Sequence, residues 1–256
     1  MADTAPGSRP GTAPPALTVS VVVPVRDDAA ALDVCLSLLA RQSIAPLEVV
    51  VVDNASSDGS AAVAHRWGAV VVAEPRVGIP AAAAAGYDAA KGDVIARLDA
   101  DSRPGPDWVR TVVERMSEDP RLDALTGTGL FHDAPRGLRT VLSVGYLGAY
   151  YVLAHLALGH TALWGSCMAV RADAWRAARA DVVRDDPEVH DDLDLAFRLG
   201  PDRRIRLCRT WRVGVSARSL RGRRQRRRRL DRAWRTLHLN WRVAPPWARW
   251  WRAVAG

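Results

Sequence analysis

This chain of 256 residues has only three cysteines, no glycine-rich nucleotide-binding loop and no apolar segment in its first 17 residues. Its three cysteines (Cys35, Cys167 and Cys208) lie far apart, which excludes the usual zinc-ligand spacing and a disulfide framework. We therefore expect a reducing compartment and predict a cytoplasmic location. Residues 1–17 are rich in Pro, Ala, Gly and Thr and lack an apolar segment, so they are predicted to be a disordered tail and not a signal peptide.

The chain also lacks the glycine-rich loops of two classes of nucleotide-binding enzyme. No G-x-G-x-x-G follows a predicted strand, as a dinucleotide-dependent dehydrogenase would need. The segment PVRDDAAAL after the first predicted strand contains no glycine, whereas a sugar nucleotidyltransferase has a glycine-rich loop with a basic pair there. The sequence therefore disfavours both classes.

Lysine is nearly absent as well, since Lys91 is the only one among 36 basic residues. The net charge of +8 would suit a nucleic-acid or an anionic-membrane partner. Residues 218–232 hold nine Arg and one Asp, so this segment carries the whole excess of charge. The sequence thus predicts a neutral domain with one basic cluster near its end.

The first half of the chain alternates short apolar runs with helix-like stretches, which is typical of parallel β/α/β units. Strands are predicted there at residues 19–23, 47–52, 69–73 and 93–98, and helices at 28–42, 59–67, 80–90 and 106–116. The second half is less regular, with predicted strands at residues 122–128, 163–170, 205–207 and 213–216. Helices are predicted there at residues 172–180, 191–199 and 221–242, and a Trp-rich tail follows Pro245 and Pro246.

Acidic residues stand at the ends of three predicted strands. Asp27 and Asp28 follow the first strand, Asp53 follows the second, and Asp99 and Asp101 follow the fourth. A single Asp at such a place is often a helix cap or a turn residue. Ligands of open parallel sheets bind outside the carboxyl ends of the strands, however, so three such acids together favour a binding site. Two carboxylates one residue apart can face one divalent cation, which would bridge a diphosphate.

Five segments, in the expected order, resemble those of the family 2 glycosyltransferases. They are VSVVVPVRDDAAAL, VVDNASSDGS, GDVIARLDADSRPGPDW, WGSCMAVRADAW and VHDDLDLAFRLG. The resemblance covers residues 18–217 and implies an α/β fold of the GT-A type, with a Rossmann-like, mostly parallel sheet flanked by helices. We assign residues 18–110 to a nucleotide-binding half, 111–217 to an acceptor half, and 218–256 to a basic, Trp-rich helical extension.

The resemblance also implies which residues form the site. Pro24, Asp28 and Asp53 would surround the base of the nucleotide sugar, and Asp99 would lie near its ribose. Asp101 would bind Mg²⁺ or Mn²⁺. Asp192 would be the catalytic base, with Asp191 beside it. Asp192 also lies at the predicted start of a helix, which favours an ionised carboxylate that can take a proton. The implied reaction moves one sugar from a nucleoside-diphosphate sugar to an acceptor hydroxyl, with inversion at the anomeric carbon.

The chain departs from the family's pattern at three places. Ala83 and Ala84 replace a common Arg-Asn pair, so one phosphate contact is missing, and a GT-A protein that has lost its activity is an alternative. Asp27 and Asp28 replace the commoner Asn-Glu. The Gln-x-x-Arg-Trp motif of processive members is also missing, because no Trp stands at the fifth place from Gln225. We therefore expect transfer of one sugar per encounter.

Residues 140–170 contain no Asp, Glu, Lys or Arg. Residues 141–159 within them are long enough to span a membrane, although glycines, a serine, a histidine and three tyrosines interrupt the stretch. Three interpretations stay open: a membrane span, a helix on a membrane surface, and a helix of the core. A span would put the two halves of the predicted site on opposite sides of a membrane, which argues against it.

Five of the ten tryptophans fall in the last 23 residues, interleaved with arginines. The Arg/Trp segment fits a solvated basic helix, a surface that docks on anionic lipid, a nucleic-acid patch, or a lid over the donor diphosphate. Nucleic acid is not expected as a partner, because acids at three strand ends would repel phosphate. Lipid docking would suit an acceptor on a lipid carrier and a peripheral position on the inner face of the membrane. A basic membrane- or nucleic-acid-binding protein is the alternative outside the enzymes.

Overall fold

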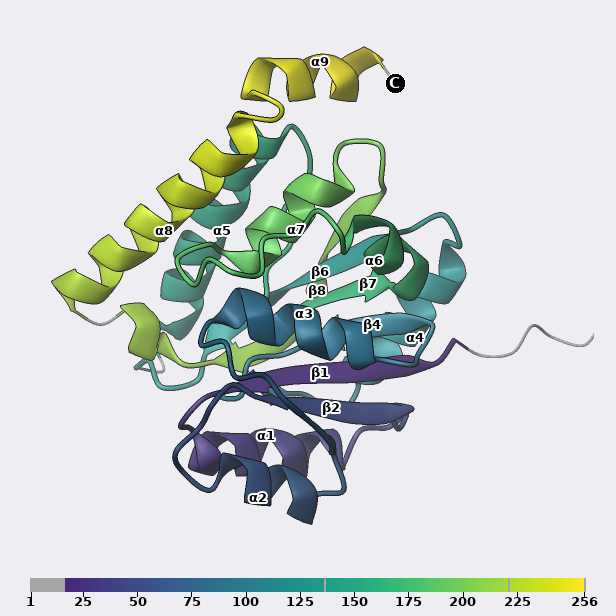
Figure 1. The fold of residues 1–256 in the computed structure, drawn as a ribbon, viewed down its shortest axis with the longest axis vertical. Coiled ribbons are helices and arrows are strands. Elements are labelled where there is room, and N and C mark those ends of the chain that lie inside the picture. The colour runs from purple at the N-terminus through teal and green to yellow at the C-terminus, as the bar shows by residue number, and fades with distance from the viewer. Residues whose placement is uncertain (1–16, 136, 221, 256) are drawn as a thin grey trace, which may run out of the picture.

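The computed structural model describes residues 17–135, 137–220 and 222–255, so most of the predicted tail (residues 1–17) lies outside the described residues. Its strands form one eight-stranded sheet in the order β3-β2-β1-β4-β7-β6-β8-β5 (Figure 1). The strands are β1 (Val19–Val25), β2 (Glu48–Asp53), β3 (Val70–Ala73), β4 (Val94–Arg97), β5 (Arg103–Pro104), β6 (Ala124–Phe131), β7 (Met168–Arg171) and β8 (Ile205–Val215). The helices are α1 (Ala29–Leu39), α2 (Ser60–Arg66), α3 (Ile79–Ala89), α4 (Trp108–Glu118), α5 (Arg139–Leu158), α6 (Ala172–Ala178), α7 (Asp191–Leu199), α8 (Arg223–Trp241) and α9 (Pro246–Ala255), with a short 3₁₀ turn at Ala217–Leu220.

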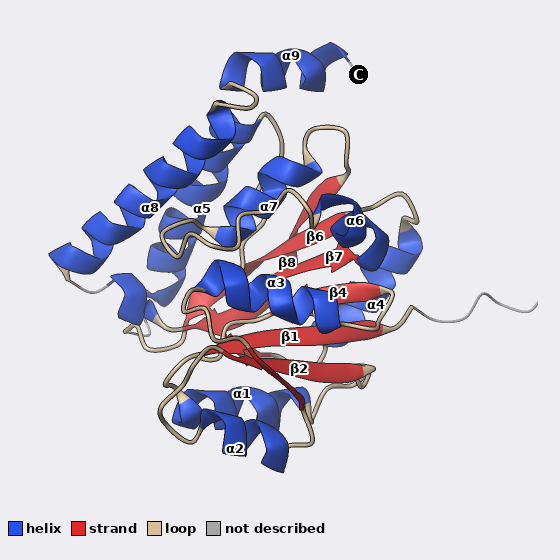
Figure 2. Cartoon of the chain, viewed as in Figure 1, coloured by secondary structure: helices blue, strands red, loops and turns tan. Residues whose placement is uncertain are grey.

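The sheet is mixed but mostly parallel, and helices cover both of its faces (Figure 2). β3, β2, β1 and β4 pair in parallel, with Val25 of β1 beside Asp53 of β2. β7 runs antiparallel between β4 and β6, and β8 pairs parallel with β6 and antiparallel with β5. This arrangement confirms the predicted α/β class. Because β1, β2 and β4 run in one direction, their carboxyl ends meet at one edge of the sheet.

Two hydrophobic cores lie on the two faces of the sheet, because side chains alternate along a strand. Val21 and Val23 of β1 belong to the core under α1, α2 and α4. Val22 between them belongs to the other core, with the alanines of α3 and with α6 and α7. A Cβ on Gly86 would stand 2.3 Å from a methyl group of Val22, so α3 can lie this close to β1 only with glycine there.

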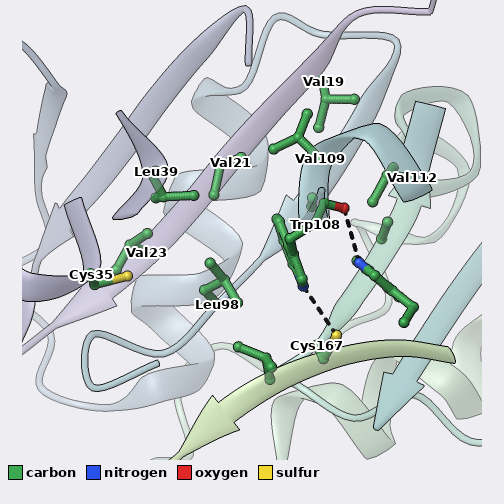
Figure 3. Close-up of a cluster of buried hydrophobic side chains, with 14 of the residues drawn as sticks. Val19, Val21, Val23, Cys35, Leu39, Leu98, Trp108, Val109, Val112 and Cys167 are labelled. Carbon is green, nitrogen blue, oxygen red and sulfur yellow. Dashed lines mark hydrogen bonds between the residues drawn. The ribbon is translucent and has the colours of Figure 1, made fainter. Parts of the chain in front are cut away.

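The tryptophan of the PGPDW segment is a core residue. Trp108 stacks on Trp211 of β8 with 5.1 Å between ring centroids, and its Nε1 donates to Sγ of Cys167 over 3.3 Å (Figure 3). Trp211 Nε1 donates in turn to the carbonyl of Trp108 over 3.0 Å. This cluster joins β8 and the segment before β7 to the start of α4. The three cysteines are all buried and free.

The second half differs from the sequence predictions at several elements. The two short strands predicted at residues 205–207 and 213–216 are one strand, β8, because it pairs with β6 across a register shift between Thr126 and Thr128. The strand predicted at residues 163–170 is reduced to β7. The residues predicted as a tail after Pro245 form the helix α9, since proline is well tolerated in a first helical turn.

The uncharged segment forms α5, which lies against the sheet along one face only. Ser143 Oγ accepts the backbone N–H of Phe131, and Tyr151 donates to the carbonyl of Gly127 over 2.6 Å. Tyr150 donates to the carbonyl of Leu163. Among the described residues, α5 alone is long and apolar enough to cross a membrane, yet only 28% of its most apolar window is buried. The interpretation as a core helix is therefore right for one face and wrong for the other.

The two C-terminal helices pack on the domain. Arg228 and Arg235 of α8 pair with Glu188 and Asp186 in the loop before α7, at 2.6 and 2.5 Å. Arg249 of α9 is 6% exposed and donates to the carbonyls that end α5 (Leu158, 2.8 Å) and lie near the end of α7 (Phe197, 3.3 Å). A cation at helix C-termini is favourable, because it meets carbonyls that have no partner within the helix.

Candidate active site

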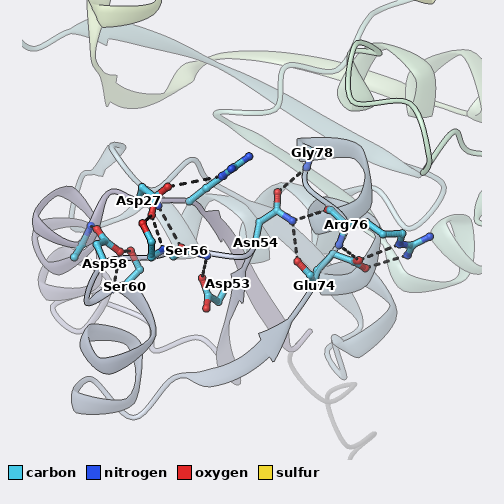
Figure 4. Close-up of polar contacts among 12 residues, drawn as sticks. Asp27, Asp53, Asn54, Ser56, Asp58, Ser60, Glu74, Arg76 and Gly78 are labelled. Atoms are coloured by element: carbon cyan, nitrogen blue, oxygen red, sulfur yellow. Dashed lines mark hydrogen bonds and ion pairs between the residues drawn. The ribbon is translucent and has the colours of Figure 1, made fainter.

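Hydrogen bonds join the loops that follow β1 and β2 at the carboxyl edge of the sheet (Figure 4). Asp27, with a φ of 51°, accepts the backbone N–H of Ser57 over 2.7 Å. Asp58 accepts the N–H of Ala29 over 2.9 Å, and Asp53 accepts the N–H of Ser56 over 3.1 Å. Hydrogen bonds to Ser57 lower the pKa of Asp27. Asp27 therefore supports the loop, and Asp28 is the member of the acidic pair that faces the other acids.

Asn54, next to Asp53, fixes the start of α3 (Figure 4). Its amide donates to the carbonyls of Glu74 and Arg76 at 2.9 and 2.7 Å. Its oxygen accepts the N–H of Gly78 over 2.8 Å. The VVDN segment thus holds the third β/α connection in place beside the predicted base pocket.

Asp28 and Asp101 converge on one cation supplied by the chain itself. Nη2 of Arg218 lies 2.5 Å from a carboxylate oxygen of Asp28 and 2.9 Å from one of Asp101. These two hydrogen bonds raise the pKa of Arg218. Burial and the neighbouring Asp99 raise the pKa of Asp101, against the effect of Arg218. Two carboxylates from different strand ends therefore share a place that accepts positive charge.

Arg97 is a buried arginine beneath the same edge. It is the last residue of β4, is 3% exposed, and pairs with Asp99 at 3.2 Å and with Asp191 at the start of α7. A Cβ on residue 165 would lie 2.5 Å from Nη1 of Arg97, so Gly165 leaves the space that the guanidinium fills. Arg97 thus links the acids that follow β4 to those that begin α7.

Charge and burial act against each other around Arg97. Burial disfavours the charged form of Arg97, yet Asp191 and the other nearby acids raise its pKa well above the usual value. Burial raises the pKa of Asp191 to about 6, although Arg97 acts in the opposite direction. The two charges are buried together, and each offsets the free-energy cost of burying the other.

Asp192 is held by two backbone N–H groups. One carboxylate oxygen accepts from Gly165 over 2.7 Å, and the other accepts from Leu193 over 2.8 Å. Ser166, next to Gly165, donates to Asp99. The WGS segment, Asp99 and the start of α7 therefore form one connected group of atoms.

Asp194 differs from its two acidic neighbours. It is 1% exposed and accepts from the N–H of Val183 (2.8 Å), from Asn240 of α8 (2.9 Å) and from Arg198 (3.3 Å). Arg198, four residues after Asp194 in α7, therefore forms an ion pair with it. Asp194 joins α7 to α8, and it lies outside the group formed by Asp191 and Asp192.

The sequence-predicted residues fall into two linked sets at the carboxyl edge. Asp28 and Asp101 meet at Arg218, and Asp99 meets Asp191 through Arg97. Pro24 and Asp53 lie on neighbouring strands, one register step apart. The roles given to all of these residues stay predictions, as do the domain boundaries.

Arg97 and Arg218 were missed by the sequence reasoning. The sequence contains a signal for Arg97, because a charged residue inside the apolar run VIARL indicates a buried strand residue that needs an acidic partner. It contains none for Arg218, because this residue stands 190 and 117 residues from its partners. Ala83 and Ala84, which stand in the place of the family's Arg-Asn pair, are both buried in α3.

A divalent cation fits the chemistry of this edge. Carboxylates are the ligands that Mg²⁺ and Mn²⁺ prefer, and those of Asp28 and Asp101 already share one positive group. Among residues 17–135, 137–220 and 222–255, no cluster of three or more His, Cys, Asp or Glu side chains could hold a metal ion alone. A cation here would therefore complete its ligands with diphosphate oxygens of a donor, as Mg²⁺ commonly does.

The comparison with protein families gives the class of this fold and site. The model of glycosyl transferase family 2 matches residues 20–176, which is more than half of the chain. The chain belongs to this family, and the predicted family and enzyme class are confirmed.

Curated relatives match a shorter stretch. The undecaprenyl-phosphate 4-deoxy-4-formamido-L-arabinose transferase of Pseudomonas aeruginosa is 38% identical over 113 residues, which are 39% of this chain and 32% of that protein. The glycosyltransferase AglE of Haloferax volcanii is 30% identical over 107 residues, 39% of this chain and 35% of that protein. The chain matches about a third of the length of these relatives.

Solved structures extend the likeness of the fold. A mannosyltransferase from Pyrobaculum calidifontis, in complex with GDP-Man and Mn²⁺, gives a TM-score of 0.62 at 23% identity, covering 93% of this chain and 73% of that one. Glucosyl-3-phosphoglycerate synthase from Mycobacterium tuberculosis, in complex with Mn²⁺, UDP and glucosyl-3-phosphoglycerate, gives a TM-score of 0.57 at 20% identity, covering 82% of this chain and 77% of that one. At these identities the likeness shows the GT-A-like fold alone.

Proposed function

We propose that this chain is an inverting, non-processive glycosyltransferase that moves one sugar from a nucleoside-diphosphate sugar to an acceptor hydroxyl. The donor lies at the carboxyl edge of β1, β2 and β4. Pro24 and Asp53 line the base pocket with Asp28, and Asp99 lies near the ribose. Asp192 takes the proton of the acceptor hydroxyl, whose oxygen attacks the anomeric carbon while the nucleoside diphosphate leaves from the opposite face.

The single observation that carries this proposal is the connected group around Asp192. Its two carboxylate oxygens accept from the N–H groups of Gly165 and Leu193, which fix its position. A general base has to be held in place to take a proton from the acceptor. Asp191 pairs with Arg97 and so positions the start of α7. The base that we propose is therefore Asp192.

Asp101, with Asp28 beside it, would hold Mg²⁺ or Mn²⁺. When bound, such a cation supplies positive charge that stabilises the departing diphosphate. Arg218 stands at the same acids, and it supplies a cation from the chain where Ala83 and Ala84 supply none. A guanidinium in this place is suited to the oxygens of a phosphate.

The acceptor we propose is carried on a lipid. The relative from Pseudomonas aeruginosa has a name that identifies undecaprenyl phosphate as its substrate. Its match to this chain supports a lipid-borne acceptor. With such an acceptor we also propose a peripheral position on the cytoplasmic face of a membrane.

The substitution Asp192→Asn tests the base. Hydrolysis of a nucleotide sugar in the presence of Mn²⁺ is measured as release of the nucleoside diphosphate, with UDP-, GDP- and dTDP-sugars. We expect release to fall by at least about 100-fold, because a positioned general base contributes about 10²–10⁴ in rate. Binding of the donor should stay within threefold, about 0.65 kcal/mol.

Asp173→Asn is the matched control, since Asp173 is an exposed acid in the first turn of another helix, α6. It should leave release unchanged. If Asp192→Asn keeps release within about threefold of the wild type, a change of under 1 kcal/mol in the barrier, the base assignment is wrong.

A further inference from the structure

The outward face of α5 is apolar and exposed over the length of the helix. Val141, Val144, Val152, Leu153 and Leu156 are 56–68% exposed, while Ser143 and Leu147 face the core. The segment carries no Asp, Glu, Lys or Arg from residue 140 to residue 170. A helix that bonds Ser143 and Tyr151 inward and leaves this many large apolar side chains exposed needs a partner for its outer face.

Exposed side chains of α8 lie next to the outward face of α5. Arg223, Arg227, Leu230, Trp234 and Trp241 follow one another at spacings of three, four or seven residues, so they form one stripe on the helix. Trp241 ends the stripe on α5, since its Nε1 donates to the carbonyl of Ala157 over 3.1 Å. Leu230 and Trp234 are 71% and 64% exposed beside it, and Arg223 and Arg227 are exposed at the other end.

α9 continues the face at the far end of α5, where Figure 1 shows it crossing above α5 and α8. Trp250 donates to the carbonyl of Leu156 over 2.9 Å and packs edge-on against His155. Trp247 and Trp251, one turn apart, are 74% and 76% exposed. Three helices that are distant in sequence thus present valine, leucine and tryptophan side by side.

We propose that this surface, called here the interfacial face, docks on an anionic lipid bilayer. It is formed by the outward side chains of α5 with Leu230 and Trp234 of α8 and Trp247 and Trp251 of α9. Aliphatic side chains enter the boundary of the acyl chains, tryptophans lie at the level of the head groups, and arginines at the rim meet anionic phosphates. Charge identifies the occupant, because Arg223, Arg224, Arg226 and Arg227 are exposed at the start of α8.

Docking by this face would bring the membrane close to the start of α7. The carbonyl of Arg229 in α8 lies 3.4 Å from Nε2 of His190, the residue before Asp191. The hydroxyl of Thr236 accepts the backbone N–H of His190 over 2.9 Å. The helix that carries Asp192 is therefore fixed to one of the three helices that contact lipid. The interfacial face supplies a surface for the membrane position in the proposed function, but it stands on exposure and charge and does not depend on the proposed reaction.

Flotation of the full chain with vesicles tests the inference. The vesicles contain phosphatidylcholine with 30% phosphatidylglycerol, at physiological salt, and pure phosphatidylcholine serves as the neutral comparison. We expect flotation with the anionic vesicles, at least fivefold less with the neutral ones, and a marked loss at 0.5 M NaCl. The double substitution Leu153→Glu and Trp251→Ala should reduce flotation at least tenfold.

Leu47→Glu with Trp67→Ala is the matched control, because both side chains are exposed on the opposite part of the domain, before β2 and after α2. The control should float as the wild type does, and both variants should keep the melting temperature of the wild type. Absence of flotation with anionic vesicles, or equal loss in the two variants, would overturn the inference. So would a dimer in light scattering that the interfacial variant alone converts to a monomer, since the occupant would then be a second copy. Release of nucleoside diphosphate in solution, followed in parallel, separates failure of docking from failure of the proposed reaction.

Discussion

Two buried arginines hold the two functional regions of this molecule together, and they do so by different means. Arg97 lies under the carboxyl edge of β1, β2 and β4, which is the proposed donor site and is called here the donor edge. Its side chain is 3% exposed and pairs with the carboxylates of Asp99 and Asp191. Arg249, under the end of α5, is 6% exposed and meets backbone carbonyls, His160 and the ring of Phe197. Acids raise the pKa of Arg97 despite its burial, whereas burial lowers the pKa of Arg249 to about 10. The carboxyl edge of the sheet is therefore neutralised by charge pairs, whereas Arg249 fixes α9 through uncharged acceptors.

Removing the charge of Arg97 should produce the largest loss of stability. Arg97→Met leaves Asp191 buried without its cation, so we expect the free energy of unfolding to fall by about 3–5 kcal/mol. Urea denaturation at pH 7 measures it. The control is Arg41→Met at an exposed arginine that bonds Ser37, where the change should stay within about 0.5 kcal/mol. A loss below about 1 kcal/mol for Arg97→Met would show that the buried charge pair does not organise the site.

Acid should weaken the C-terminal region through His160. Burial, with Arg249 at 3.1 Å, lowers the pKa of His160 to about 4. The unfolded chain binds this proton near pH 6.5, so the stability that neutral His160 contributes is present above pH 6.5 and is lost as the pH falls towards 4. Between pH 7 and pH 5 this loss amounts to about 2 kcal/mol. His160→Gln should flatten that part of the stability curve; an unchanged slope would contradict the prediction.

The contact between Arg218 and the two acids should have the smallest effect. Its side chain is 56% exposed, and an exposed ion pair is worth about 0.2–1 kcal/mol. Arg218→Ala should therefore leave the melting temperature nearly unchanged. It should also increase the affinity for Mn²⁺ alone by about threefold, because Asp28 and Asp101 then lose their competing cation. Titration calorimetry with Mn²⁺ measures this effect, and weaker binding would contradict competition between Arg218 and the metal for the two carboxylates.

The donor edge could be predicted from the sequence because its signals are local. A strand followed at once by an acid, as in VVVVD, gives both the element and the position of the side chain at the sheet edge. The contacts of the C-terminal helices could not, since Arg249 meets Leu158 across 91 residues and Arg228 meets Glu188 across 40. The interpretation of the uncharged helix stayed open for the same reason. Composition predicts that residues 141–159 are apolar, but only the position of α5 on β6 decides which side chains remain exposed.

The most direct test of the account is donor binding that depends on Asp101 and on Mn²⁺. Thermal unfolding is followed with UDP-, GDP- and dTDP-sugars, each with and without Mn²⁺, for the wild type and for Asp101→Asn. A donor at about 100 times its Kd stabilises a protein by about 2.7 kcal/mol, so we expect one class of nucleotide sugar to raise the melting temperature by several degrees with Mn²⁺. In Asp101→Asn that rise should be lost while the unfolding temperature without donor is kept. If no nucleotide sugar shifts the wild type with or without Mn²⁺, the account of a nucleotide-sugar transferase at this sheet edge is contradicted.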